Sequence, residues 1–134
     1  MAQFSTDVLN AMLDAIETTI GASAILRIFT GTKPANCAAA DSGTQLAQIT
    51  CPSDYLAAAA AAIKSKSGTW QGTAGDDGTA GHFRIYEGTG TTCKWQGNIT
   101  VTGGGGDMEV NNTDFANGQT FTITAVSLNL TASL

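Results

Sequence analysis

The first twenty residues carry apolar side chains at spacings of three and four, which is the period of one helix face. This face consists of Phe4, Val8, Leu9, Met12, Leu13, Ile16 and Ile20. Ser5 or Thr6 is suited to cap the helix, Asp7 favours its first turn, and Gly21 is suited to end it. We therefore predict one amphipathic helix over residues 5–20. Its wide apolar face must pack on a sheet or on another subunit, because isolated helices of this length are marginal in water.

After the helix, the hydrophobic period changes from about 3.6 to 2, the period of β-strands. We predict strands over residues 24–30, 45–50, 67–71, 82–87, 93–102, 107–111 and 120–130. In the last of these the alternation slips near Val126, which indicates a β-bulge. Turn signals recur about every ten residues, as in sandwiches and barrels. The expected fold is mainly β, a jelly-roll-like sandwich or barrel with one N-terminal helix, in a single domain spanning residues 1–134.

Two segments do not follow either period. Residues 31–44 form a long irregular stretch, and a loop of this length in a small domain is either functional or held in place by packing. Residues 57–62 are six consecutive alanines. Alanine has the highest helix propensity, but a small side chain also suits an extended segment between two close surfaces. Residues 55–63 are therefore left open between a helix or mixed coil and a strand.

Composition narrows the classes of function. Only 13% of the residues are charged, about half the usual share, and the net charge is −5. The six basic residues do not cluster, so nucleic acid is not an expected partner, because phosphate binding needs a concentrated positive field. No apolar stretch reaches the roughly 20 residues that span a bilayer, and no export signal is visible. We expect a protein made in the cytoplasm that does not bind a membrane.

The three cysteines do not form the C-x-x-C spacing that is typical of zinc sites. We expect reduced thiols at Cys37, Cys51 and Cys93. A disulfide between Cys37 and Cys51 across a short loop, or a bond from Cys93 to a symmetry-related copy, stays open at this point.

Candidate catalytic residues are few and do not match a known constellation. His82 is the only histidine, without a nucleophile elbow or a metal-binding partner motif. Asp76, Asp77 and Glu109 lie in turn-rich segments, and an acid-dependent hydrolase built from them has no supporting spacing. The glycines at 103–106 lack the Lys and Ser/Thr of a phosphate loop. We therefore expect no catalytic residue, no metal and no cofactor.

Aromatic residues offer the remaining binding chemistry. Tyr55, Trp70, Tyr86 and Trp95 could stack on a sugar, but they are scattered over different segments. Core packing is the simpler interpretation.

Several stretches, taken together, resemble small capsid decoration (cement) proteins of short-tailed bacteriophages. The stretches are residues 13–18, 30–31, 34–44, 52–55, 68–71, 80–85 and 103–108. They are spread along the chain in order, and none carries known chemistry. The resemblance implies a jelly-roll-like protein on the outside of an icosahedral head. Such proteins bind across junctions between major capsid protein subunits, often as dimers or trimers.

We therefore expect a non-enzymatic virion protein on the capsid exterior, with the major capsid protein and further copies of itself as partners. The expected contact elements are the helix, residues 31–44 and the sheet edges. The candidate subunit-contact residues are Val8, Met12, Leu13, Ile16, Pro34 and Asn36. The alternatives are a tail or head-fibre component, or a β-sandwich module that binds a carbohydrate or receptor.

Overall fold

The structure, a computed structural model, describes residues 2–134. Within this range the chain forms one α-helix, nine β-strands and a final 3₁₀ turn. The elements are α1 (Thr6–Ile20), β1 (Ile25–Thr30), β2 (Gln45–Thr50), β3 (Ile63–Ser65), β4 (Gln71–Thr73), β5 (Gly78–Tyr86), β6 (Cys93–Val101), β7 (Met108–Val110), β8 (Asp114–Phe115), β9 (Thr120–Asn129) and η1 (Thr131–Ser133). The predicted mainly β fold with one N-terminal helix is confirmed. No helix in residues 2–134 is long and apolar enough to cross a bilayer.

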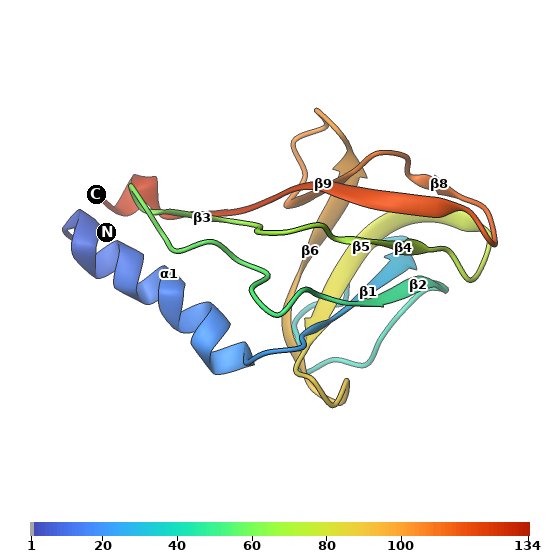
Figure 1. The fold of residues 1–134 in the computed structure, drawn as a ribbon, viewed down its shortest axis with the longest axis horizontal. Helices are drawn as coiled ribbons and strands as arrows, with labels where there is room; N and C mark the ends of the chain where they lie inside the picture. The colour runs from blue at the N-terminus through green and yellow to red at the C-terminus, as the bar shows by residue number, and fades with distance from the viewer. Residues whose placement is uncertain (1) are drawn as a thin grey trace.

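The strands form one strongly curved sheet in the order β2-β1-β5-β6-β7-β9-β3 (Figure 1). All pairs along this path are antiparallel except β6–β7, which is parallel. Strand β4 pairs with β9 and also lies beside β2, where the Gly75 amide donates to the Leu46 carbonyl at 2.8 Å. A Cβ on Gly72 would collide with Ile49 of β2. The sheet therefore folds over onto itself as a sandwich.

The apolar core fills the space between the two halves of this sheet. Leu26 and Ile28 of β1 point into it, as their alternation predicts, together with Phe83 and Ile85 of β5. Trp70 is enclosed in the same cluster. The other face of β1 and β5 is covered by residues 31–44 instead of by a second sheet.

Strand β9 contains the predicted bulge. Glu109 of β7 pairs with Ala125, whereas the next residue, Val110, pairs with Ile123, so that Thr124 is an extra residue. The buried positions accordingly change from odd to even numbers along the strand, ending at Val126. The predicted slip is confirmed, with the extra residue two positions before Val126.

Helix α1 packs against β3 rather than across the middle of the sheet. Figure 1 shows α1, β3, the end of β9 and η1 together at one end of the molecule, which we call the arm. The Phe4 amide donates to the Ser133 carbonyl at 2.7 Å, so the two ends of the described chain lie side by side. The arm thus carries the start of the helix away from the main core, which the end of the helix reaches at Ile16 and Ile20.

The alanine run is irregular: it forms neither a helix nor a continuous strand, so the mixed coil is confirmed. Two side chains of α1 accept hydrogen bonds from the backbone of the alanine run. Asp14 accepts the Ala59 amide at 2.8 Å, and Asn10 accepts the Ala62 amide at 2.9 Å. Ala61 and Ala62 adopt positive φ values of 52° and 61°. Tertiary hydrogen bonds have overridden the intrinsic helix propensity of alanine.

Two predicted strands begin four residues away from the expected position, and β3 and β8 were not predicted. The strand expected over residues 67–71 is reduced to β4, which begins at Gln71, because Trp70 is buried with its indole donating to the Ser67 carbonyl at 3.1 Å. Strand β5 begins at Gly78, earlier than expected, because this segment pairs with β8.

Candidate subunit-contact surface

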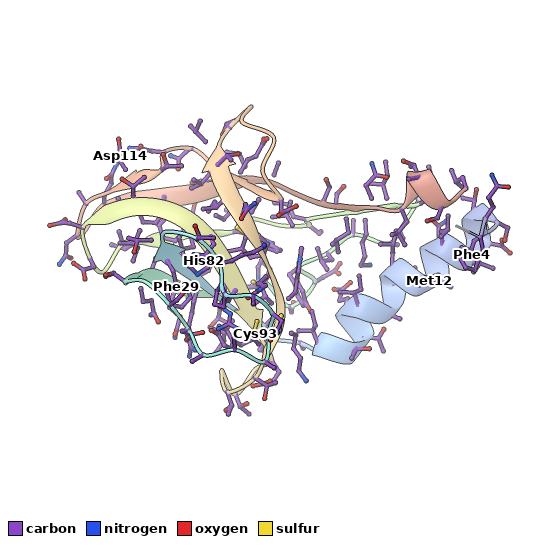
Figure 2. All side chains as sticks on the ribbon, turned by 180° about the vertical axis from the view of Figure 1, so that it is seen from behind. Phe4, Met12, Phe29, His82, Cys93 and Asp114 are labelled. Atoms are coloured by element: carbon purple, nitrogen blue, oxygen red, sulfur yellow. The ribbon has the colours of Figure 1, made fainter. Side chains whose placement is uncertain are left out.

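Helix α1 exposes a row of large apolar side chains on its outer side. Phe4, Val8 and Met12 are 40%, 43% and 47% exposed. Val8 and Met12 lie one turn apart on α1, and Phe4 immediately precedes the helix cap at Ser5. We call these three residues the α1 stripe. Figure 2 places Phe4 and Met12 along the arm, far from His82 and Asp114. The expected contact residues Val8 and Met12 therefore lie on one accessible face.

The opposite side of α1 faces inward. Leu13 is only 2% exposed, and Leu9 and Ile20 are also buried. The assignment of Leu13 as a subunit-contact residue was therefore wrong, because its side chain packs inside its own chain. Ile16 is half-buried and packs against the core cluster. It lies one turn after Met12, at the border of the α1 stripe.

A buried lysine holds α1 onto β3 within the arm. Lys64 of β3 has a side chain only 2% exposed, and its Nζ lies 2.7 Å from Asp14 and 3.3 Å from Glu17 on consecutive turns of the helix. The ammonium also donates to the Ala57 carbonyl at 2.9 Å. All three of its protons thus have acceptors, and the helix is fixed to both β3 and the alanine run.

The contacts of Lys64 and Asp14 explain the shifts of their pKa values. Burial by itself lowers the pKa of Lys64, but the hydrogen bonds to Asp14 and Glu17 outweigh it, and the net change is upward. The hydrogen bond from Lys64, supported by the Ala59 amide, lowers the pKa of Asp14. Both groups are therefore held charged, and the cluster is an ion-pair anchor.

A second buried cation holds residues 31–44 onto the sheet. Arg84 of β5 has a side chain 1% exposed, and its Nη1 lies 2.5 Å from Asp41 Oδ1. Its Nη2 donates to the carbonyls of Cys37 and Ala39 at 2.9 and 3.0 Å. The Tyr86 hydroxyl also donates to Asp41. This loop is held in place by packing and hydrogen bonds, one of the two alternatives drawn from its length.

The two loop residues expected at subunit contacts have structural partners. The Pro34 carbonyl accepts from Gln96 Nε2 at 2.8 Å. Asn36 is exposed, and its side-chain oxygen accepts the amides of Ala38 and Ala39, each at 3.0 Å. Both residues therefore shape the loop surface, and the outer side of that surface remains accessible at Asn36.

The residues considered for catalysis lie apart and serve local structure. His82 is fully buried, with Nδ1 2.8 Å from the Gly31 carbonyl and its ring stacked 5.2 Å from Phe29. Asp77 accepts the Asn117 amide at 2.7 Å. Glu109 accepts the amides of Gly103 and Gly105 and so orders the glycine-rich turn. Across residues 2–134, no group of three or more His, Cys, Asp or Glu side chains is arranged to hold a metal.

The aromatic residues do not form an exposed platform. Tyr55, Trp70 and Tyr86 are buried. Trp95 is half-buried, edge-on to Phe83 with the ring centres 5.5 Å apart. These residues are core and boundary packing, as the simpler interpretation of the sequence held, and the carbohydrate-binding alternative loses the surface on which it depended.

Sequence reasoning missed the importance of Lys64 and Arg84, which were counted only as scattered basic residues. A signal was available for Arg84, because it lies in the middle of the apolar stretch at 82–86. Charged residues are rarely fully buried unless they are paired, and the sequence could not show the pairs.

Comparison of the chain with protein-family models, with curated proteins and with solved structures found no match. Support for a function therefore comes from the α1 stripe and the ordered loop, together with the resemblance of the sequence segments described above.

Proposed function

We propose that this protein is a non-enzymatic bacteriophage structural protein that binds the outer surface of the assembled capsid and reinforces contacts between major capsid protein subunits. The observation that carries the proposal is the α1 stripe. The sequence resemblance to capsid decoration proteins is the reason for proposing the capsid as the partner. The low fraction of charged residues suits a protein whose surface is covered by neighbouring subunits.

The α1 stripe is the contact between copies of this chain. Phe4, Val8 and Met12 form one row, and Leu134, also largely exposed, follows the Ser133 carbonyl that binds the Phe4 amide. Contiguous exposed apolar residues of this kind are typical of interaction sites. Two stripes from symmetry-related copies are self-complementary, because the same residues face each other across the axis. A two-fold dimer would therefore bury this row against its own copy.

Residues 31–44 are the surface offered to the shell. Arg84 and Tyr86 hold the loop from below, while small side chains, among them Ala35, Ala38 and Ala40, are exposed on it. A surface that is already ordered loses little conformational entropy on binding. An oligomer that binds through several such loops gains further, because the second and later contacts are intramolecular.

The first test is the copy number of this chain in purified virus particles, measured by quantitative mass spectrometry against the major capsid protein. A ratio near one chain per capsid subunit supports the decoration role. A handful of copies per particle favours the tail or head-fibre alternative, and absence from particles contradicts both.

A second test separates the α1 stripe from the rest of the surface. The double variant Val8→Asp/Met12→Asp should become monomeric in analytical ultracentrifugation and should bind shells more weakly, with unchanged circular dichroism. Val101→Asp is the matched control, because Val101 is equally exposed but lies on β6. A variant that keeps its oligomeric state would contradict the assignment of the stripe.

A further inference from the structure

Two of the three cysteines meet where residues 31–44 lie on the sheet. Cys37 is half-buried in the loop, and Cys93 is buried at the start of β6. Both line a pocket of about 380 Å³ together with Arg84 and Tyr86. Figure 2 shows Cys93 at this face of the sheet, beside the loop.

The backbone explains why residues so distant in sequence come together. The Cys37 carbonyl is fixed by Arg84 Nη2 at 2.9 Å. Cys93 is the cross-strand partner of Tyr86, two residues along β5 from Arg84. The Cys93 side chain has both the Cys37 thiol and the Arg84 guanidinium as neighbours. The loop and the β5–β6 hairpin thus bring the thiols side by side.

Cys51 is placed differently. It follows β2, its amide donates to the Ala24 carbonyl at 2.8 Å, and it belongs to the apolar core. Burial raises the pKa of its thiol to about 12. Of the pairings left open by the sequence, the structure favours neither Cys37–Cys51 nor a bond from Cys93 to another copy.

We propose that Cys37 and Cys93 form an intramolecular disulfide when the protein meets glutathione disulfide outside a reducing cytosol, while Cys51 stays reduced. This inference does not depend on the proposed function. The bond would fasten residues 31–44 to β6 at a second point beside the Arg84–Asp41 pair, and so make permanent the ordering of the loop.

The reaction proceeds by two thiol–disulfide exchanges. The more accessible Cys37 loses its proton, and its thiolate attacks one sulfur of glutathione disulfide, which releases one glutathione. The Cys93 thiolate, next to the positive Arg84, then attacks the Cys37 sulfur and expels the second glutathione. The two cysteines together lose two protons and two electrons, and one glutathione disulfide becomes two glutathione molecules.

The second exchange should depend on pH. Burial, reinforced by the Cys37 thiol, raises the pKa of the Cys93 thiol to about 11, although Arg84 opposes this rise. Because the thiolate is the nucleophile, closure should accelerate as the pH rises.

The test is to incubate the full chain with glutathione disulfide, unfold it, block free thiols with iodoacetamide and measure its mass. We expect one blocked cysteine in the oxidised protein against three in the reduced protein, and one cross-linked peptide pair that contains Cys37 and Cys93. Three blocked cysteines after oxidation, or a link that includes Cys51, would overturn the proposal.

Single variants make the test independent of any one substitution. Cys51→Ser should still close the bond, whereas Cys37→Ser should not. Oxidation should raise the melting temperature of the wild-type chain by roughly 10 °C, because the bond closes a long loop in the unfolded state. The same treatment should leave Cys37→Ser unchanged. A rise of equal size in Cys37→Ser would contradict the assignment.

Discussion

Two regions of this molecule each hold an irregular segment onto a strand through a buried cation, but the cations differ. In the arm, Lys64 ties α1 and the alanine run to β3; on the other side of the protein, Arg84 ties residues 31–44 to β5. Both cations are almost fully buried, and each is paired with a carboxylate that is partly exposed. In each region a segment without regular structure is held by a charge supplied from a strand.

The chemistry of each cation matches the segment it holds. An ammonium is a compact charge with three protons, and Lys64 uses them on two carboxylates of one helix and one carbonyl. A guanidinium is a planar fork with five N–H donors, and Arg84 spreads over Asp41 and two loop carbonyls. A fork can organise several acceptors along an irregular loop, whereas a point charge suffices for a helix that is already regular.

The largest expected effect is that of Arg84→Met. Removing the guanidinium leaves the carbonyls of Cys37 and Ala39 without their donor and the Asp41 carboxylate with the Tyr86 hydroxyl but without its close cation. We expect a loss of roughly 3 kcal/mol. Urea unfolding measures the free energy, and limited proteolysis should show early cleavage within residues 31–44. Arg27→Met is the control, since Arg27 is 4.0 Å from Asp41 and more exposed. A smaller loss for Arg84→Met than for Arg27→Met would contradict the anchoring role.

Lys64→Met should cost less, roughly 1–2 kcal/mol. The Asp14 side chain is 46% exposed and can recover water when the ammonium is gone. Hydrogen exchange should accelerate in α1 and leave β5 and β6 protected. Lys66→Met is the matched control, because the Lys66 ammonium donates to the nearby Gly68 carbonyl rather than to the carboxylates of α1. Equal losses for the Lys64 and Arg84 variants would remove the distinction between the two regions.

Ala61→Gly should stabilise the protein, by roughly 0.5 kcal/mol, although a glycine usually destabilises. Ala61 is exposed at φ 52°, a conformation that strains a residue with a Cβ and suits glycine. Ala58→Gly, in the same run but without a positive φ, should lose about 0.5–1 kcal/mol. Thermal unfolding of the pair gives the sign; a loss at both positions would show that the strain at Ala61 is already relieved.

The smallest expected effect on stability is that of Glu87→Gln, at the turn between β5 and β6. The Thr89 hydroxyl, then the Thr92 and Thr91 amides, lower the pKa of Glu87 to about 2. A lowered carboxyl pKa stabilises the folded state above the ordinary value near 4.5, and this contribution is lost as the pH falls towards 2. Glu87→Gln should therefore melt below the wild type at pH 7 and approach it at pH 3. A difference that does not change with pH would contradict this origin.

Much of the fold could be predicted from the sequence, because helices and strands each impose a local period on the apolar residues. The 3.6-residue period placed α1, the two-residue period placed most strands, and the change of phase in β9 marked the bulge at Thr124. For the candidate site, the helical spacing identified Val8 and Met12 on an apolar face, but it could not tell the outer side from the inner side occupied by Leu13.

The tertiary structure alone decided where distant residues meet. The alanine run has a strong helix propensity, yet Asn10 and Asp14 hold it open because α1 lies against it. Cys37 is closer in sequence to Cys51 than to Cys93, but the fold places it beside Cys93. Lys64 and Arg84 became structural only through acceptors that lie far along the chain. Period and propensity are local properties that a sequence displays directly, whereas the pairing of a buried charge depends on which segments the whole fold brings within hydrogen-bonding distance.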